Sequence, residues 1–281
     1  MADSVLMKLE EMLPEAAYFM EKEVFTEKEM RDIMTERRAH ELAVNSSCYT
    51  IRDFLNYINH EIETECRRRE RYEELKIKKQ GPRDTSIIQR IHSLFNRCIL
   101  KFSHDLSVWQ KFIEFCASSG SSKALNRVLM RAIKRHPRVA SLRIIAADRE
   151  LHQGNLNGAR KLLMRTVRIG TDNQLLAWEQ LFKLECVAVH RIVTTPLKTK
   201  AQSTEGTCPT DEESEPTAVS SPSCQAAMVV YRHAVKDLSS NTLALKKFNE
   251  FVREALESLE MSILGFTEPQ CFEQLKEAVR L

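Results

Sequence analysis

Arginines recur at a regular spacing in this sequence and could act together. Arg97, Arg131 and Arg165 follow one another at intervals of 34 residues, and each comes three residues after an aliphatic residue. Guanidinium groups that recur on one face of stacked elements can bind the phosphates of a nucleic acid or the carboxylates of an acidic protein. We therefore predict a face for RNA or an acidic partner that comprises Arg97, Arg127, Arg131, Arg135, Arg160, Arg165 and Arg168.

The segment that carries most of these arginines is strongly basic. Residues 122–170 hold twelve Lys or Arg and two acids, Asp148 and Glu150, a net charge of +10, whereas the whole chain has a net charge of +3. An ordinary solvated helix face, or one neutralised by an acidic segment of the same chain, is the alternative interpretation. No RRM-type aromatic motif, KH loop or zinc knuckle occurs in the sequence. Any RNA contact would therefore involve the backbone rather than the bases, and would weaken steeply with salt.

Motifs for catalysis, metals and cofactors do not occur in this sequence. His60-Glu61 lacks the second histidine of H-E-x-x-H, and neither a P-loop nor a G-x-S-x-G motif is present. The eight cysteines form no C-x-x-C pair, which favours reduced thiols in an intracellular protein over a disulfide framework or a zinc site. We predict a protein that is not an enzyme, with no cofactor, no metal, no small-molecule substrate, no secretory signal and no membrane span.

The elements that position the arginines are predicted from a repeated eight-residue pattern. An apolar pair, an arginine, a small residue and then Ile or Val recur in Leu94–Lys101, Val128–Arg135 and Leu162–Ile169. A fixed period of 20 to 50 residues is typical of stacked supersecondary units. Gly and Pro are few, and no strand-like alternation occurs. The sequence therefore predicts an all-α fold, a right-handed α-solenoid of helix pairs with a period of 34 residues.

Helix boundaries are predicted from periodicity and capping residues. Thr26 and Glu29 form a capping-box pattern that starts a helix, whereas Pro14 is expected at a helix break or a first helical position. Gly120, Gly154 and Gly170 are expected to end helices. Beyond two or three helices in residues 1–41, the predicted helices lie at 51–79, 85–101, 109–118, 122–135, 139–153, 156–169, 175–184, 230–236, 248–256 and 271–281.

The composition divides the chain into four parts. Residues 1–82 are predicted to be an N-terminal helical domain, and residues 83–193 a helical-repeat solenoid. Residues 194–225 are rich in Ser, Thr, Pro and acidic residues and are predicted to be a disordered acidic linker, because they cannot bury enough apolar area to offset chain entropy. Residues 226–281 are predicted to add further helices of the same kind, in an incomplete set.

Aromatic residues at helical spacing make the repeat similar to a known class of helical repeat. Trp109, Phe112 and Phe115, followed by Ala124 and the Arg131-Ala132 pair, resemble the HAT (half-a-TPR) repeat of RNA-processing proteins, and Ala159-Arg160 with Trp178 and Glu185 match it again. Two positions depart from the pattern, since Arg143 stands where an aromatic residue is expected and Thr166 replaces alanine. We interpret the aromatic positions as packing between helices rather than a peptide groove. The predicted packing residues are Trp109, Phe112, Phe115, Trp178, Phe182 and Ala132.

The N-terminal part resembles one HAT-repeat family. The matching segments are Leu13-Pro14-Glu15 followed by Phe25, Asp53 to Ile58 with Glu61, Arg67-Arg68-Arg69, and Val108 to Cys116. They resemble the U3 small nucleolar RNA-associated protein 6 family, a HAT-repeat subunit of the small-subunit processome. The family's members are longer, so this chain would be a shortened or divergent form.

The resemblance implies a function, a location and partners. It implies a scaffold in the nucleolus, within the nucleus, that contacts WD-repeat proteins and the U3 snoRNA and pre-rRNA particle during 18S ribosomal RNA maturation. Two alternatives stay open at this point. One is a helical-repeat protein that binds RNA directly without sequence specificity, and the other is a TPR-like adaptor that binds peptides.

Overall fold

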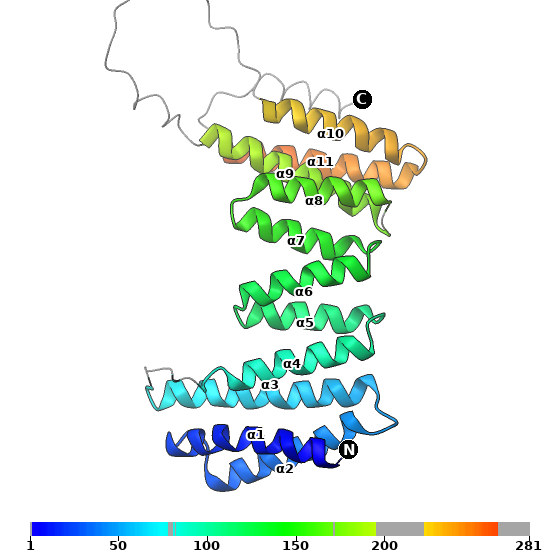
Figure 1. The fold of residues 1–281 in the computed structure, drawn as a ribbon. Coiled ribbons are helices and arrows are strands. Elements are labelled where there is room, and N and C mark those ends of the chain that lie inside the picture. The colour runs from blue at the N-terminus through cyan, green and yellow to red at the C-terminus, as the bar shows by residue number, and fades with distance from the viewer. Residues whose placement is uncertain (1, 78–80, 82, 171, 195–221, 264–281) are drawn as a thin grey trace, which may run out of the picture. The chain divides into compact units, whose positions relative to one another are not determined.

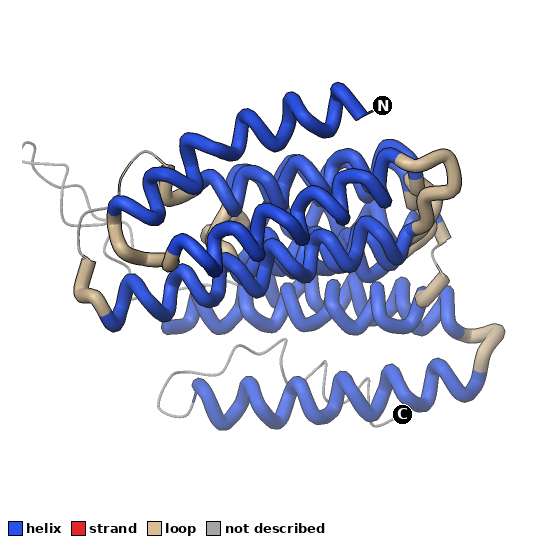
Figure 2. The backbone as a smooth tube through the Cα atoms, turned by 90° about the horizontal axis from the view of Figure 1, so that it is seen from below, coloured by secondary structure: helices blue, strands red, loops and turns tan. Residues whose placement is uncertain are grey.

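The computed structural model describes residues 2–77, 81, 83–170, 172–194 and 222–263. Over these residues the fold is all-α, with eleven helices and no strand. Figures 1 and 2 show how these helices follow one another along the chain. The prediction of an all-α helical-repeat fold is therefore confirmed. The helices form two compact units, Met1–Arg135 and His136–Leu281, and each is described by itself below.

The first unit is a series of six helices in which each packs against the next. Its buried residues include aromatic side chains from several helices, and Phe95 and Phe112 stack with ring centroids 4.6 Å apart. Burial of these apolar faces supplies most of the stability of the helices, because helical stability in proteins comes mainly from tertiary packing. The helices are α1 (Ala2–Glu21), α2 (Glu27–Asn45), α3 (Ile51–Glu74), α4 (Ser86–Lys101), α5 (Leu106–Ser118) and α6 (Ser122–Arg135).

The described residues of the second unit form five helices. Both α10 and α11 pack against α9, which in turn packs against α8, and Phe182, Tyr231 and Phe248 lie in the shared core. α10 begins at Pro222, within the residues 194–225 that were predicted to be a linker. Residues 195–221 of that linker and the predicted helix 271–281 lie outside the described residues. The helices are α7 (Ala140–His152), α8 (Leu156–Ile169), α9 (Gln174–Thr194), α10 (Pro222–Leu238) and α11 (Thr242–Ile263).

Glycines end α5 and α7 in the same way. Gly120 and Gly154 have φ values of 68° and 84°, in the left-handed region that glycine adopts without steric cost. Each donates its N–H to the carbonyl three residues back, and the next residue, Ser121 or Asn155, donates to the carbonyl five residues back. This is the Schellman arrangement. The predicted glycine caps are thus confirmed at both positions, which lie 34 residues apart.

Two predicted helix features in the first unit were wrong. Pro14 lies inside α1 rather than at a break, although an interior proline removes a backbone hydrogen bond and costs about 3 kcal/mol. The apolar face that holds the helix together continues past it, since Met12 and Phe19 are both buried. α3 ends at Glu74 instead of Lys79, because Lys76 adopts a left-handed conformation with φ 51°.

Glu29 joins the start of α2 to the end of α3. Its carboxylate accepts a hydrogen bond from the Thr26 backbone N–H at 2.9 Å, and Thr26 Oγ1 accepts from the Glu29 N–H, which completes the predicted capping box. Arg71 of α3 donates to the same carboxylate from Nη1 at 2.9 Å. The hydrogen bonds from Arg71 and Thr26 lower the pKa of Glu29 to about 2.

Replacing Arg71 with glutamine is expected to return the pKa of Glu29 towards its ordinary value of 4.5. Because the pKa in the folded protein is lower than in the unfolded chain, the stabilisation by Glu29 is present above pH 4.5 and is lost as the pH falls towards 2. NMR titration of the Glu29 carboxyl carbon measures both values. A Glu29 pKa near 4.5 in the unsubstituted protein would show that this contact does not form.

Candidate interaction surfaces

A buried ion network links the first four helices. Glu15 of α1, Arg37 of α2, Glu61 of α3 and Arg90 of α4 each contribute one side chain. Arg37 donates to both oxygens of Glu61, at 2.7 and 2.9 Å, and to Glu15 at 3.2 Å. Burial raises the pKa of the Glu61 carboxyl, but Arg37 and Arg90 outweigh burial and hold this pKa below its ordinary value. Four charges are therefore compensated inside the core.

Arg97, the first arginine of the predicted row, belongs to a second ion cluster. Its guanidinium donates to both oxygens of Glu41 in α2, at 2.8 and 3.1 Å, and Lys8 of α1 donates to the same carboxylate. Burial raises the pKa of Glu41, whereas Arg97 and Lys8 lower it, with a net shift below the ordinary value. Glu41 is buried, so the charge of Arg97 is used within the fold.

Arg160 is similarly paired in the second unit. It donates to both oxygens of Glu185, from Nε at 2.6 Å and from Nη2 at 2.7 Å, and thereby joins α8 to α9. Glu185 is fully buried. Arg165 and Arg168 are exposed on α8, and Arg165 lies near Arg143, whose pKa is lowered by burial and by that neighbouring charge. The predicted cationic residues thus have different environments.

One face of α6 forms a cationic surface of the first unit. Lys123, Arg127, Arg131 and Lys134 are all exposed and lie on one face of the helix; we call them the α6 cation row. Arg135 is exposed beside them and contacts His104. Arg131 donates to Asn96 Oδ1 at 2.7 Å, and its guanidinium lies 5.7 Å from the centre of the Trp109 ring.

Most of the predicted packing residues lie in the core. Trp109, Phe112 and Ala132 are buried, and Phe115 is half-buried with its ring 5.8 Å from that of Phe95. In the second unit Trp178 and Phe182 are buried. Thr166, which stands at the alanine position of the repeat, is fully buried and its hydroxyl donates to the Leu162 carbonyl at 2.9 Å. These side chains contact other helices rather than solvent.

An apolar surface that the sequence patterns did not indicate lies on α1. Leu6, Leu13 and Met20 follow one another at intervals of seven residues and have exposed fractions of 48%, 56% and 37%. Seven residues are close to two helical turns, so the three lie in line, and we call them the α1 apolar stripe. Glu10 and Glu21 are exposed on the same helix. In the sequence, this stripe is visible only as a second row of apolar residues on a helix that already has one apolar face.

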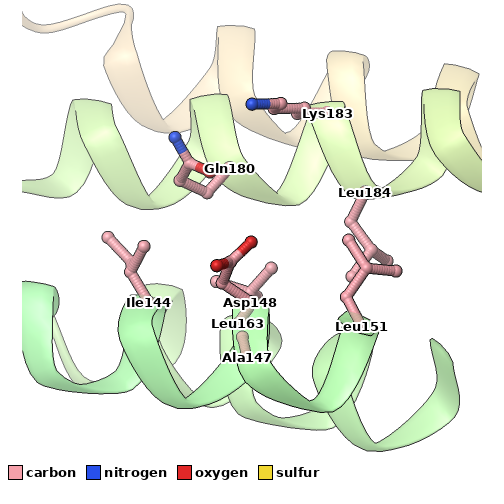
Figure 3. A pocket seen from close by; sticks show the side chains of 8 residues that line it. All are labelled: Ile144, Ala147, Asp148, Leu151, Leu163, Gln180, Lys183 and Leu184. Atoms are coloured by element: carbon pink, nitrogen blue, oxygen red, sulfur yellow. The ribbon is translucent and has the colours of Figure 1, made fainter. Parts of the chain in front are cut away.

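One small cavity and two open grooves lie within the units. A cavity of about 40 Å³ lies between α7 and α9, where Asp148 points towards Gln180 and Lys183 (Figure 3). It is far smaller than the ~300 Å³ that ligand pockets usually reach. An open groove of about 410 Å³ lies between α9 and α11, and another of about 730 Å³ lies beside Arg68, Tyr72 and Asp84. In the second groove Arg68 is paired with Glu65, and Tyr72 with Asp84.

Two features are absent from the part of the chain that the structure describes. No helix there is sufficiently long and apolar to span a bilayer. Within the same residues, no three His, Cys, Asp or Glu side chains are grouped in a way that could bind a metal ion.

Comparison with known protein families agrees with the series of packed helices described above. Residues 51–185 match the model of the PRP39 C-terminal HAT repeat, and residues 9–90 match the model of U3 small nucleolar RNA-associated protein 6. The chain is a HAT-repeat protein, a class of helical-repeat proteins that are not enzymes. Within that class, its N-terminal part is similar to the U3 small nucleolar RNA-associated protein 6 family, which confirms the resemblance found in the sequence.

Curated relatives carry the same name. The U3 small nucleolar RNA-associated protein 6 of Schizosaccharomyces pombe is 29% identical over 187 residues, which cover 66% of this chain and 38% of that protein. The homologue of Mus musculus is 25% identical over 199 residues, covering 68% of this chain and 32% of that protein, and the Homo sapiens homologue is 24% identical over 194 residues. The chain thus spans about a third of the length of the curated relatives it matches.

Proposed function

We propose that this chain is a scaffold component of a nucleolar ribonucleoprotein complex that contains the U3 small nucleolar RNA. It would act in ribosomal RNA processing, in the maturation of 18S ribosomal RNA and of the small ribosomal subunit, and would be located in the nucleolus. The names of the relatives support the association with the U3 particle. The repeat architecture supports a scaffold, because stacked helices present a long surface on which several partners can bind.

The observation that carries the scaffold proposal is the α1 apolar stripe. Exposed apolar side chains arranged in line mark protein interaction sites, since solvation of such a stripe costs free energy that a partner removes. Leu13 and Met20 lie within residues 9–90, the segment that matches the family model. Glu10 and Glu21 supply acidic groups beside the stripe. We propose that a protein of the complex, a WD-repeat subunit among the candidates, contacts this stripe.

Substitution of both leucines, Leu6→Ser with Leu13→Ser, is expected to reduce the U3 RNA recovered with the tagged chain from cells by roughly tenfold or more. Two apolar anchors that each contribute about 1 kcal/mol or more to association account for such a loss. Stability should change little, because surface substitutions usually stay within about 0.5 kcal/mol. The measurement is immunoprecipitation followed by quantification of U3 RNA and of the bound proteins, with and without RNase.

The matched control replaces two exposed leucines on other helices, Leu100→Ser with Leu243→Ser, whose exposed fractions are 76% and 64%. The control should recover U3 RNA as the unsubstituted chain does. Partner proteins that stay bound after RNase support a scaffold held by protein contacts. If the unsubstituted chain recovers no U3 RNA, the proposed function is wrong; if both double variants behave alike, the α1 apolar stripe is not the contact.

A further inference from the structure

The α6 cation row has no carboxylate partner among the described residues, whereas several other arginines of the first unit each have one. Arg37, Arg68, Arg71, Arg90 and Arg97 each form an ion pair with a glutamate. α6 contains no acidic residue at all, and among the described residues no ion pair joins Lys123, Arg127, Arg131 or Lys134 to a carboxylate. The charges of this row are therefore left for an external anion.

Intramolecular stability does not explain the row. Like charges four residues apart on a helix repel each other and destabilise it by a few tenths of a kcal/mol per pair. Three such pairs follow one another at intervals of four residues: three members of the row, Lys123, Arg127 and Arg131, and then Arg135 beside it. An ordinary solvated face alternates charges of both signs, as α2 does where the exposed Glu27 pairs with the exposed Arg31. A face of one sign gains only when an anion binds to it.

Arg131, in the middle of the row, is held in place before any ligand arrives. Asn96 Nδ2 donates to the His92 carbonyl at 2.9 Å, which orients the amide so that its Oδ1 accepts from Arg131 at 2.7 Å. The Trp109 ring lies under the guanidinium. Both partners are uncharged, so they fix the position of the cation without neutralising it. Fixing a long side chain in advance reduces the entropy lost on binding.

We propose that the α6 cation row binds the phosphodiester backbone of RNA. From Lys123 to Lys134 the row rises roughly 17 Å along the helix at 1.5 Å per residue, so it can contact several consecutive phosphates. Trp109, the aromatic residue next to the row, is buried and is not available to stack on a base. Binding is therefore insensitive to base sequence. The choice of RNA over an acidic protein segment rests on the proposed function.

The test uses the purified full-length chain and a labelled poly-uridine oligonucleotide, with binding measured by fluorescence anisotropy across a salt series. Four phosphate contacts give a slope of log K against log salt of about −3 for a single strand. The variant Arg127→Gln with Lys134→Gln is expected to lose two contacts, which reduces the steepness of the slope by about 1.4 and the affinity at 0.1 M salt roughly 10- to 30-fold. Poly-adenosine should bind as poly-uridine does.

The control removes the same charge from another surface of the same unit, with Arg52→Gln and Lys111→Gln, both exposed. It should keep the slope and the affinity of the unsubstituted chain. An equal loss in both double variants, or no loss in either, overturns the proposal. So does displacement of the oligonucleotide by poly-glutamate at an equal concentration of charge, because the row would then bind acidic protein segments. None of these results depends on recovery of U3 RNA from cells, which tests the proposed function separately.

Discussion

Replacing Glu61 with glutamine is expected to lower the free energy of unfolding of the first unit by about 3–5 kcal/mol, because removal of one partner leaves buried charges uncompensated. Glu61 is fully buried and accepts hydrogen bonds from Arg37 and Arg90. Glutamine has nearly the same shape but no charge, so the two guanidinium groups would share only Glu15. Urea or thermal denaturation followed by circular dichroism measures the change.

Two further variants separate the ion network from other causes. Glu63→Gln makes the same chemical change two residues along α3 at an exposed position, and it should change stability by less than about 0.5 kcal/mol. Combining Glu61→Leu with Arg37→Met removes both members of the central pair and leaves Arg90 with Glu15. This double variant should be more stable than Glu61→Gln, since apolar replacement of a whole buried pair is often neutral. A double variant that is less stable would show that the charges stabilise the unit directly.

Local features of the fold were predictable from sequence because their causes lie within a few residues of each other. The Thr26–Glu29 capping box and the glycine at position 120 act on backbone groups of the same turn, so the residue types alone identify them. α6 and α8 begin and end where the sequence predicted, at Ser122–Arg135 and Leu156–Ile169. Pro14 could not be placed in this way. Its position depends on tertiary packing of α1, which outweighs a local helix-breaking tendency.

The candidate sites were less predictable than the helices, because charge partners are distant in sequence. Arg97 and Arg131 have the same repeat position and the same local sequence pattern, yet only Arg97 faces a buried glutamate, Glu41, which lies 56 residues earlier. No pattern within the repeat distinguishes the two arginines. The α1 apolar stripe was hidden for a similar reason, since a periodic apolar helix does not reveal which of its faces a neighbour covers.

Trp109 and Arg143 occupy equivalent positions of successive repeats and make equivalent hydrogen bonds. Trp109 Nε1 donates to the Ser103 carbonyl at 3.0 Å, six residues back, and Arg143 Nη1 donates to the Pro137 carbonyl, also six residues back. Both side chains are 3% exposed. Arginine therefore reproduces the polar contact of the aromatic residue, but its Nε is buried without a hydrogen-bond partner in the described residues, and Arg165 lies nearby.

Truncation of the two residues should consequently have unequal effects. Trp109→Ala is expected to destabilise the first unit by about 3–5 kcal/mol, because it removes a large buried ring and leaves a cavity. Trp109→Phe should cost less, since it keeps most of the packing and loses the hydrogen bond to Ser103, which contributes about 1 kcal/mol. Arg143→Ala should cost less than Trp109→Ala, because removal of a buried cation with an unpaired donor relieves a desolvation penalty that offsets part of the lost packing.

Chemical denaturation of the three variants measures these differences, with circular dichroism as the probe of both units and the fluorescence of Trp178, which all three variants retain, as the probe of the second unit. Two probes are needed because the two units can unfold separately, and a single transition would then misrepresent the free energy. Equal losses for Trp109→Ala and Arg143→Ala would mean that the guanidinium packs as well as the indole and that its charge carries no penalty. A smaller loss for Arg143→Ala means that relief of the desolvation penalty offsets part of the packing and hydrogen bonding lost with the side chain.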